Sequence, residues 1–323
     1  MFFRIFLFVI SFLSVGLLNA QTCCSGGIPL SNNIGLNFSD ADATLFSLSY
    51  DYNYLNTLKN ESNVLDDNSR LRTTTSILLN VGHSFGTKFT LEGLFTWVRQ
   101  TRRITQFGNQ NLDVTSGIGD AVVLGNFAVL SNPLSSTNLR LGLGVKVPLG
   151  STTEKNSQGI VLNADLQPGS GAWDLLYVIT VIQQLNLRPS LSLSFRSVYR
   201  QTGTNSEYLG NSAYKFGNEF QAYLGLVDQF LIKTVLINPS LTFKYRNARK
   251  DTIDSNLLPN TGGNWIFIMP NISVLIARNL NIYATGELPI YAVPDGLQLT
   301  PTYRITAGFI YSFLSKPKIE KFQ

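Results

Sequence analysis

Residues 306–313 read TAGFIYSF, and this stretch decides the fold class. Phe309, Tyr311 and Phe313 occupy every second position, whereas Thr306 and Gly308 lie at alternate positions. Successive side chains of a β-strand point to opposite faces, so this alternation predicts a strand with one apolar and one polar face. If the pattern continues along the chain, the protein is all-β.

The same alternation recurs from residue 44 onward. Phe46, Leu48 and Tyr50 alternate with Ser47 and Ser49, for example. Strands are predicted at residues 44–54, 70–85, 89–103, 119–130, 139–150, 172–183, 187–202, 214–228, 235–250, 264–276, 280–292 and 301–313. Segments of ten or more residues suit a tilted bilayer crossing, whereas strands of soluble proteins average five or six residues.

The connections between these strands alternate between long and short. Long ones fall at 55–69, 104–118, 151–171, 203–213, 251–263 and 293–300, with turns such as 86–88 between them. This layout is typical of outer-membrane barrels, in which the sheet must close because lipid offers its backbone no hydrogen-bond partner. We predict an all-β, transmembrane, antiparallel up-and-down β-barrel of about 12 strands over residues 44–313.

A soluble β-sandwich is the competing fold, because it shows the same alternation. Three features favour the barrel. The predicted strands are long, and aromatic residues such as Phe85, Tyr199 and Tyr245 lie on the apolar face near strand ends, where they suit interfacial girdles. Charged residues make up only 14% of the chain, against about 25% in ordinary soluble domains.

The termini predict export. Residues 1–20, with Arg4, an apolar run and Ala20, have the pattern of a signal peptide, the alternative being a membrane-anchoring helix. We expect Sec-dependent export to the outer membrane of a Gram-negative bacterium. Residues 21–43 are predicted to form an N-terminal periplasmic or plug segment, and residues 314–323 a periplasmic tail. The net charge of +5 includes no basic block, so no nucleic-acid partner is expected.

The last strand also carries a candidate assembly signal. The spacing of Thr306, Gly308, Tyr311 and Phe313 resembles the β-signal by which outer-membrane barrels are recognised. The resemblance implies the barrel assembly machinery and outer-membrane lipid as partners. The tail after Phe313 is a departure, since many such proteins end at this aromatic residue.

If the apolar parity faces lipid, the other parity lines a lumen rich in basic residues. Burying unpaired charges is costly, so we expect water inside, ion pairs across the wall, or both. The alternative is that these side chains only fill and brace a narrow barrel. The predicted solute path comprises Arg70, Arg72, Glu92, Arg140, Lys146, Arg196, Arg200, Lys215, Glu219, Lys244, Arg246, Glu287 and Arg304, with Asp51 and Arg102 on the same face.

Neither an enzyme nor a cofactor is predicted. The single histidine, His83, has the lipid-facing parity and lies near the turn at 86–88, which does not suit a serine–histidine site. Cys23 and Cys24 are adjacent and are the only cysteines. Two thiolates suit a soft metal such as Cu(I), and the alternative is a pair of inert or partner-linked cysteines.

Three segments resemble a family of outer-membrane transporters named for the meta-pathway of phenol degradation. They are GIGD at 117–120, LGLGVKVPLG at 141–150 and LQPGSGAWD at 166–174, with Leu149 where the family usually has Thr. The resemblance implies a monomeric barrel related to channels for hydrophobic compounds, and no catalytic residues. Gly142 and Gly144 are expected to leave space beside Lys146. The candidate gating loop comprises Gln167, Pro168, Gly169, Gly171, Trp173 and Asp174.

The leading functional prediction is therefore an outer-membrane channel that passes a small hydrophobic or anionic solute by passive diffusion. The alternative is a non-conducting structural or binding barrel that captures a partner or a metal through Cys23 and Cys24.

Overall fold

The computed structural model describes residues 21–22, 41–132 and 136–313. The predicted signal peptide, Cys23, Cys24 and the tail after Phe313 lie outside the described residues. The described helix, Ala164–Leu166, is a single 3-10 turn. No helix in the described part of the chain is long and apolar enough to span a bilayer.

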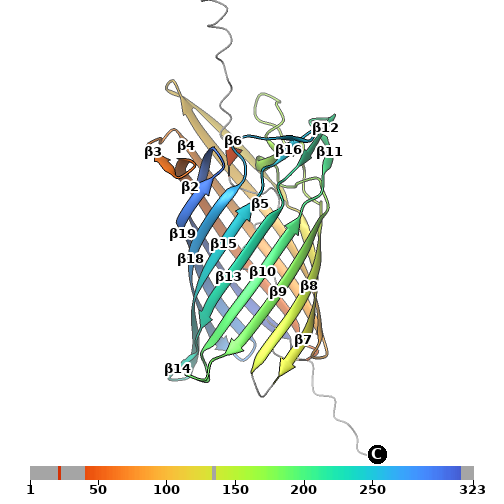
Figure 1. The fold of residues 1–323 in the computed structure, drawn as a ribbon, viewed down its shortest axis with the longest axis vertical. Coiled ribbons are helices and arrows are strands. Elements are labelled where there is room, and N and C mark those ends of the chain that lie inside the picture. Colours follow the sequence, from red (N-terminus) through yellow and green to blue (C-terminus); the bar gives the residue numbers. More distant parts are fainter. Residues whose placement is uncertain (1–20, 23–40, 133–135, 314–323) are drawn as a thin grey trace, which may run out of the picture.

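Twelve strands form a closed antiparallel barrel, as predicted (Figure 1). Each strand pairs with the next along the wall, and β20 pairs with β2 to close it. The strands are β2 Thr44–Asn60, β4 Arg70–Phe85, β5 Phe89–Gln106, β7 Ala121–Asn132, β8 Thr137–Val147, β9 Asp174–Gln184, β10 Ser192–Gln201, β13 Glu219–Val227, β15 Val235–Ala248, β18 Gly263–Ala277, β19 Leu280–Pro294 and β20 Leu297–Phe313.

The two faces of the wall follow the predicted parity. On β4, Ile77 is 43% exposed on the outside, whereas its neighbours Ser76 and Leu78 are buried inside. Phe95 on β5 is likewise exposed beside the buried Thr96. An apolar outer surface with internally paired backbone is what a hydrocarbon environment requires.

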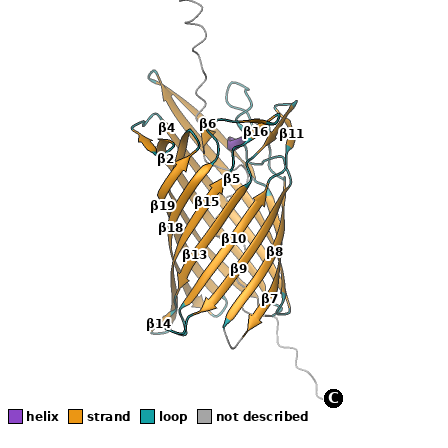
Figure 2. Cartoon of the chain, in the orientation of Figure 1, coloured by secondary structure: helices purple, strands orange, loops and turns teal. Residues whose placement is uncertain are grey.

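The long connections carry further strands at one end of the barrel (Figure 2). β3 Asn63–Leu65 pairs with β2, and β6 Asn109–Ile118 forms a hairpin with β5, so most of the predicted 104–118 loop is strand. A separate four-stranded sheet, here called the outer sheet, contains β11 Asn205–Tyr208, β12 Ser212–Lys215, β16 Thr252–Ile253 and β17 Asn256–Leu257. β14 Phe230–Ile232 pairs antiparallel with the first residues of β15 at the short-turn end.

The outer sheet corrects one prediction. Lys215 lies on β12 and pairs with Thr252 on β16, whereas the barrel strand β13 begins at Glu219. The chain leaves the wall at Gly217, where a Cβ atom would lie 1.8 Å from the carbonyl oxygen of Arg249. Lys215 therefore does not line the barrel wall.

The segment predicted as periplasmic or plug is described only at its ends. Gln21–Thr22 forms β1, which pairs in parallel with Gln298 and Leu299 at the long-loop end of β20. Ala43 lies at the short-turn end, where its N–H bonds to Ser84 Oγ at 2.8 Å.

Candidate functional site

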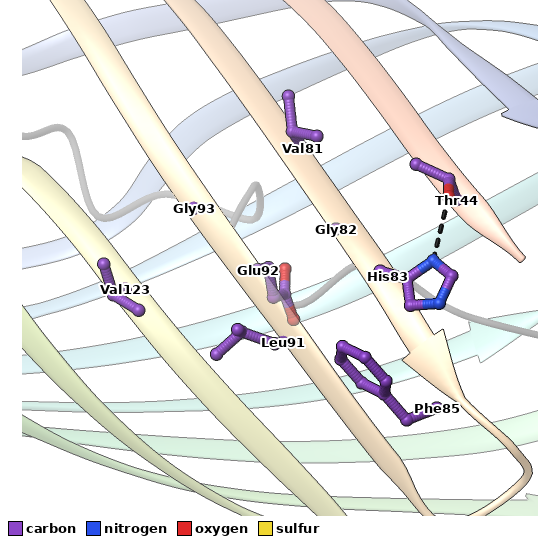
Figure 3. A pocket seen from close by; sticks show the side chains of 9 residues that line it. All are labelled: Thr44, Val81, Gly82, His83, Phe85, Leu91, Glu92, Gly93 and Val123. Atoms are coloured by element: carbon purple, nitrogen blue, oxygen red, sulfur yellow. Dashed lines mark hydrogen bonds between the residues drawn. The ribbon is translucent and has the colours of Figure 1, made fainter. Parts of the chain in front are cut away.

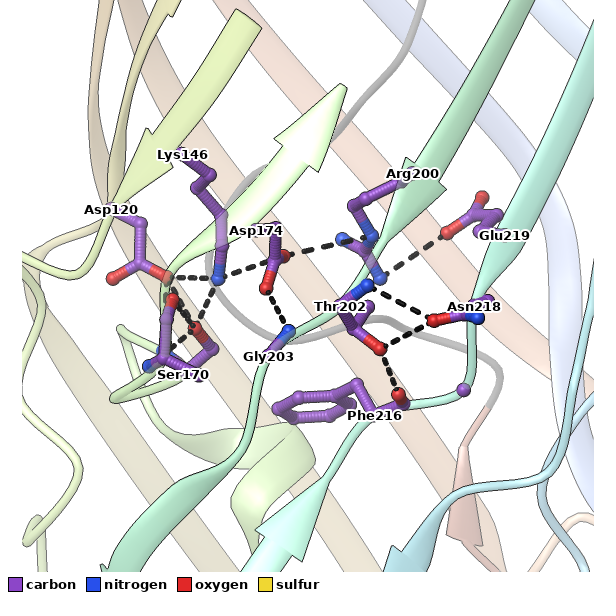
Figure 4. A network of polar contacts seen from close by, with 12 residues as sticks. Asp120, Lys146, Ser170, Asp174, Arg200, Thr202, Gly203, Phe216, Asn218 and Glu219 are labelled. Carbon is purple, nitrogen blue, oxygen red and sulfur yellow. Dashed lines mark hydrogen bonds and ion pairs between the residues drawn. The ribbon is translucent and has the colours of Figure 1, made fainter. Parts of the chain in front are cut away.

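A buried lysine organises the mouth of the barrel (Figure 4). Lys146 on β8 is 1% exposed, and its Nζ lies 2.8 Å from Asp120 Oδ2 and 3.1 Å from Asp174 Oδ2. Nζ also donates a hydrogen bond to Ser170 Oγ. The second oxygen of Asp120 accepts the N–H of Gly150 at 3.2 Å. One ammonium group therefore joins β8, β9 and the residue directly before β7 to the loop between β8 and β9.

The ion pairs continue along the wall as a ladder. Arg200 on β10 lies between Asp174 (3.8 Å) and Glu219 (3.4 Å), and Arg246 Nε lies 2.6 Å from Glu219. The Arg246 guanidinium also lies 4.8 Å from the centroid of the Trp265 ring. Because charged groups removed from water need partners of opposite sign, such a ladder makes their burial tolerable.

The connection between β8 and β9, residues 148–173, folds inward and is here called the inner loop. Arg72 on β4 is fully buried and reaches Asp165 of this loop at 2.7 Å. Arg72 also donates to the carbonyl oxygen of Asp165 and to Gln100 Oε1. A basic side chain of the wall and an acidic side chain of the loop therefore hold each other inside the mouth.

Two hydrogen bonds between uncharged groups fix the same loop to the wall. Gln100 on β5 donates to the carbonyl oxygen of Gln167 at 3.1 Å, and Thr115 on β6 donates to that of Leu166 at 2.6 Å. The loop backbone also passes very close to itself, since a Cβ atom on Gly169 would lie 2.3 Å from the carbonyl oxygen of Gly150. Only glycine permits this approach.

The outer sheet covers the inner loop from the other side. Ala164 of the loop packs in one buried cluster with Tyr208, Tyr214 and Phe216. The buried part of the inner loop, residues 164–170, thus lies between the barrel wall and the outer sheet.

The predicted gating residues divide into two groups. Gln167, Pro168 and Gly169 are buried in the inner loop, and Asp174 begins β9 beside Lys146. Gly171 has a positive φ of 68°. Trp173, by contrast, is 61% exposed. The gating prediction itself stays a prediction, although most of these residues lie in or next to the inward-folded segment.

Most of the predicted lumen cations have partners. Arg70 pairs with Asp67 at 3.8 Å, Arg102 with Asp113 at 2.7 Å, Lys244 with Glu287 at 2.9 Å and Arg304 with Asp51 at 2.8 Å. Glu92 accepts from Asn126 at 2.8 Å, and Arg140 Nε donates to Asn138 at 3.3 Å. Arg196 differs, as described below.

Sequence reasoning missed Asp120, Asp165 and Ser170. Asp165 lies in none of the three family-like segments, but the other two residues do. Asp120 ends the first segment, Lys146 lies in the second, and Ser170 and Asp174 lie in the third. The fold brings all three segments together at Lys146. The added acids also reduce the basic excess predicted for the lumen.

The inner face also carries a cluster of buried apolar side chains that the parity argument did not predict. We call it the inner apolar band. Gly144 leaves room for two of these side chains to pack against its backbone. A Cβ atom at this position would lie 3.1 Å from Leu124 Cδ1 and 3.4 Å from Leu176 Cβ. The space expected beside Lys146 is therefore filled by these side chains. The band comprises Leu78, Leu94, Val122, Leu124, Leu176, Val178, Val198, Tyr223, Trp265, Phe267, Met269 and Ala292.

His83 lies on the outer face of β4, as its parity predicts (Figure 3). Its Nδ1 lies 2.9 Å from Thr44 Oγ1. Its ring packs edge to face with that of Phe85, with the ring centroids 4.6 Å apart. These residues and Gly93 line a hollow of about 260 Å³. Within the described residues, no group of three or more His, Cys, Asp or Glu is placed to hold a metal.

The candidate assembly residues lie on the seam where β20 meets β2. Thr306 donates to Asp51 at 2.6 Å, and Gly308 lies opposite Ser49. Tyr311 and Phe313 have the opposite parity, and their rings contact each other at 4.6 Å.

Comparisons with known proteins agree with this architecture. The family model described as "Putative MetA-pathway of phenol degradation" matches residues 38–257. No curated protein matches the sequence. A solved outer-membrane channel from Pseudomonas putida F1 has a TM-score of 0.66 at 13% identity, covering 86% of this chain and 100% of the other.

Two further solved structures are similar at a TM-score of 0.50. They are the β domain of the Bordetella autotransporter BrkA, at 10% identity over 84% of this chain and 100% of the other, and the transport unit of AIDA-I from Escherichia coli, at 13% identity over 87% and 93%. At these identities the similarity shows an outer-membrane β-barrel fold.

Proposed function

This chain belongs to the family described as the MetA-pathway of phenol degradation, and we propose that it is an outer-membrane channel. It passes a small hydrophobic or anionic solute by passive diffusion, and the inner loop forms its constriction. The observation that carries the proposal is the position of that loop, which Arg72, Gln100 and Thr115 hold inside the barrel mouth.

The wall supports a transport role in two ways. Its inner face combines charged side chains with the inner apolar band, so a solute with polar and apolar parts would find contacts for both. The similar Pseudomonas structure is itself an outer-membrane channel. Export and insertion at the outer membrane, with the assembly machinery recognising Thr306, Gly308, Tyr311 and Phe313, belong to the same proposal.

Planar-bilayer recordings test the channel and its constriction together. Replacing residues 153–166 with Gly-Ser removes the part of the inner loop that reaches Arg72 but keeps Gly150, Ser170 and the Lys146 cluster. The single-channel conductance is expected to rise by about twofold or more, because the narrowest part of a pore dominates its resistance.

A matched control removes Leu209 and Gly210 from the exposed turn between β11 and β12 and should leave the conductance unchanged. Equal conductance of the loop-shortened variant and the unaltered protein would contradict the constriction. Absence of any current from correctly inserted protein would refute the channel and favour the non-conducting barrel.

A further inference from the structure

Arg196 on β10 differs from the other basic side chains of the barrel wall. Its parity directs it inward, next to Val198 and opposite the exposed Phe195. Its Nε and Nη2 atoms are shielded from solvent, and among the described residues they have no hydrogen-bond partner and form no salt bridge. The residue as a whole keeps intermediate exposure, so part of it is still accessible.

Unmade charged hydrogen bonds of this kind are costly. A guanidinium group carries five donors in a planar fork that fits a carboxylate or phosphate with two parallel bonds. Shielded donors without a partner lose hydration and gain nothing in return. Glu92 attracts Arg196 electrostatically but forms no hydrogen bond to these nitrogens, whereas Glu219 pairs directly with Arg200 and Arg246. An anion at Arg196 would supply the missing acceptor.

A second cation and a hydroxyl flank Arg196 along the wall. Arg196 pairs with Thr180 on β9, and Thr180 pairs with Arg140 on β8. All three have the inward parity. Strands lie about 4.8 Å apart, so the backbones of Arg140 and Arg196 are about 10 Å apart. Two long side chains at this separation can reach one anion between them, above the Thr180 hydroxyl.

Buried apolar groups border this row on one side, and Ile182, opposite Ser194, is the apolar neighbour on the other. Val178 and Val198 are paired across β9 and β10, one inward position beyond Thr180 and Arg196, and both are buried. Tyr223 on β13 is the cross-strand neighbour of Arg196. All three belong to the inner apolar band, whereas on the opposite side β10 continues with Ser194 and Ser192.

We propose that Arg196, Thr180 and Arg140 form a binding site for the carboxylate of a small amphipathic monocarboxylate whose apolar body points toward the side bordered by Val178, Val198 and Tyr223. This inference rests on the proposed function, because it specifies the class of solute that the channel passes. A free inorganic anion would satisfy the arginines but leave the apolar side unused, and a neutral hydrocarbon would leave the Arg196 nitrogens unpaired.

Equilibrium dialysis of the refolded protein against labelled hexanoate tests the site. Acetate lacks the apolar body and hexan-1-ol lacks the charge, so both are expected to bind at least about tenfold more weakly than hexanoate. Arg196→Gln should weaken hexanoate binding by at least about tenfold and leave hexan-1-ol binding unchanged. Arg103→Gln, at an exposed position on β5, is the charge-matched control and should bind hexanoate normally.

If Arg196→Gln does not fold, Thr180→Val and Arg140→Gln provide the readout, and each should weaken hexanoate binding while Arg103→Gln does not. Equal hexanoate binding by the unaltered protein and the folded variants would overturn the site, as would equal binding of acetate and hexanoate. Bilayer recordings of the same preparation keep the two proposals apart. Current without hexanoate binding refutes only this site, and hexanoate binding without current refutes only the channel.

Discussion

Lys146 shows how one side chain makes a polar mouth possible in this barrel. Its Nζ lies within 3.1 Å of two carboxylates that are themselves at most 3% exposed. Removing one partner of a buried ion pair costs more than the pair contributes, because a charge is left without compensation. Here the loss of one ammonium group would leave both Asp120 and Asp174 uncompensated on that side.

We therefore predict that Lys146→Met lowers the free energy of unfolding by about 3–5 kcal/mol. Urea unfolding in detergent micelles, followed by tryptophan fluorescence, measures the change. Arg188→Met is the control, because Arg188 is 44% exposed, pairs with Asp228 at 3.1 Å, and should cost less than about 1 kcal/mol. A similar loss in both variants would show that the buried cluster is not a special source of stability.

Parity placed Lys146 on the inner face but could not identify its partners. Alternation along a strand reports which face a residue occupies and contains no information on which distant loop returns to it. Asp165 and Ser170 lie in a connection without period-two alternation, and their contacts with Arg72 and Lys146 depend on the loop folding inward. The ladder was therefore beyond a sequence argument, although the three family-like segments contain Asp120, Lys146 and Asp174.

At the scale of elements, the strands were predicted well because each has one apolar face. The start of β13 was predicted too early. The alternation of Tyr214 and Phe216 continues into β13, although the chain joins the barrel wall only at Glu219. The outer sheet that results is joined to β15 through a half-buried acid, Asp251, directly before β16. Asp251 accepts hydrogen bonds from the Tyr214 hydroxyl at 2.6 Å and from the N–H of Gly217 at 2.7 Å.

Burial raises the pKa of the Asp251 carboxyl above its ordinary value of 3.8. A carboxyl with a raised pKa favours the folded sheet when protonated, so this contribution is complete below the ordinary pKa and is lost as pH rises through the folded one. Hydrogen exchange of residues 205–217, corrected for intrinsic rates, should show greater protection at acidic than at neutral pH. Asp251→Asn should abolish this pH dependence, and identical profiles for the two proteins would contradict the assignment.

At the scale of the whole molecule, one seam between the first and last barrel strands closes the sheet. It runs from Thr44 opposite Phe313 to Asn60 opposite Leu297. Asp51 strengthens its middle by accepting from Arg304 at 2.8 Å and from Thr306 at 2.6 Å. The TAGFIYSF stretch is thus the edge that leaves no strand of the wall unpaired, which a membrane-spanning sheet requires.

Gly308 gives the most direct test of this closure. A Cβ atom there would lie 2.5 Å from the carbonyl oxygen of Leu48 and 2.6 Å from Ser49 Cβ, so Gly308→Ala must displace β2 backbone. We expect a loss of about 1–3 kcal/mol in the free energy of unfolding and a lower yield of the heat-modifiable folded band on gels. Gly286→Ala on β19 is the control, because its nearest atom is Pro270 Cγ at 3.6 Å, and it should fold normally. If both variants close equally well, tight packing at the seam is not what limits closure, and the polar contacts of Asp51 would have to provide it instead.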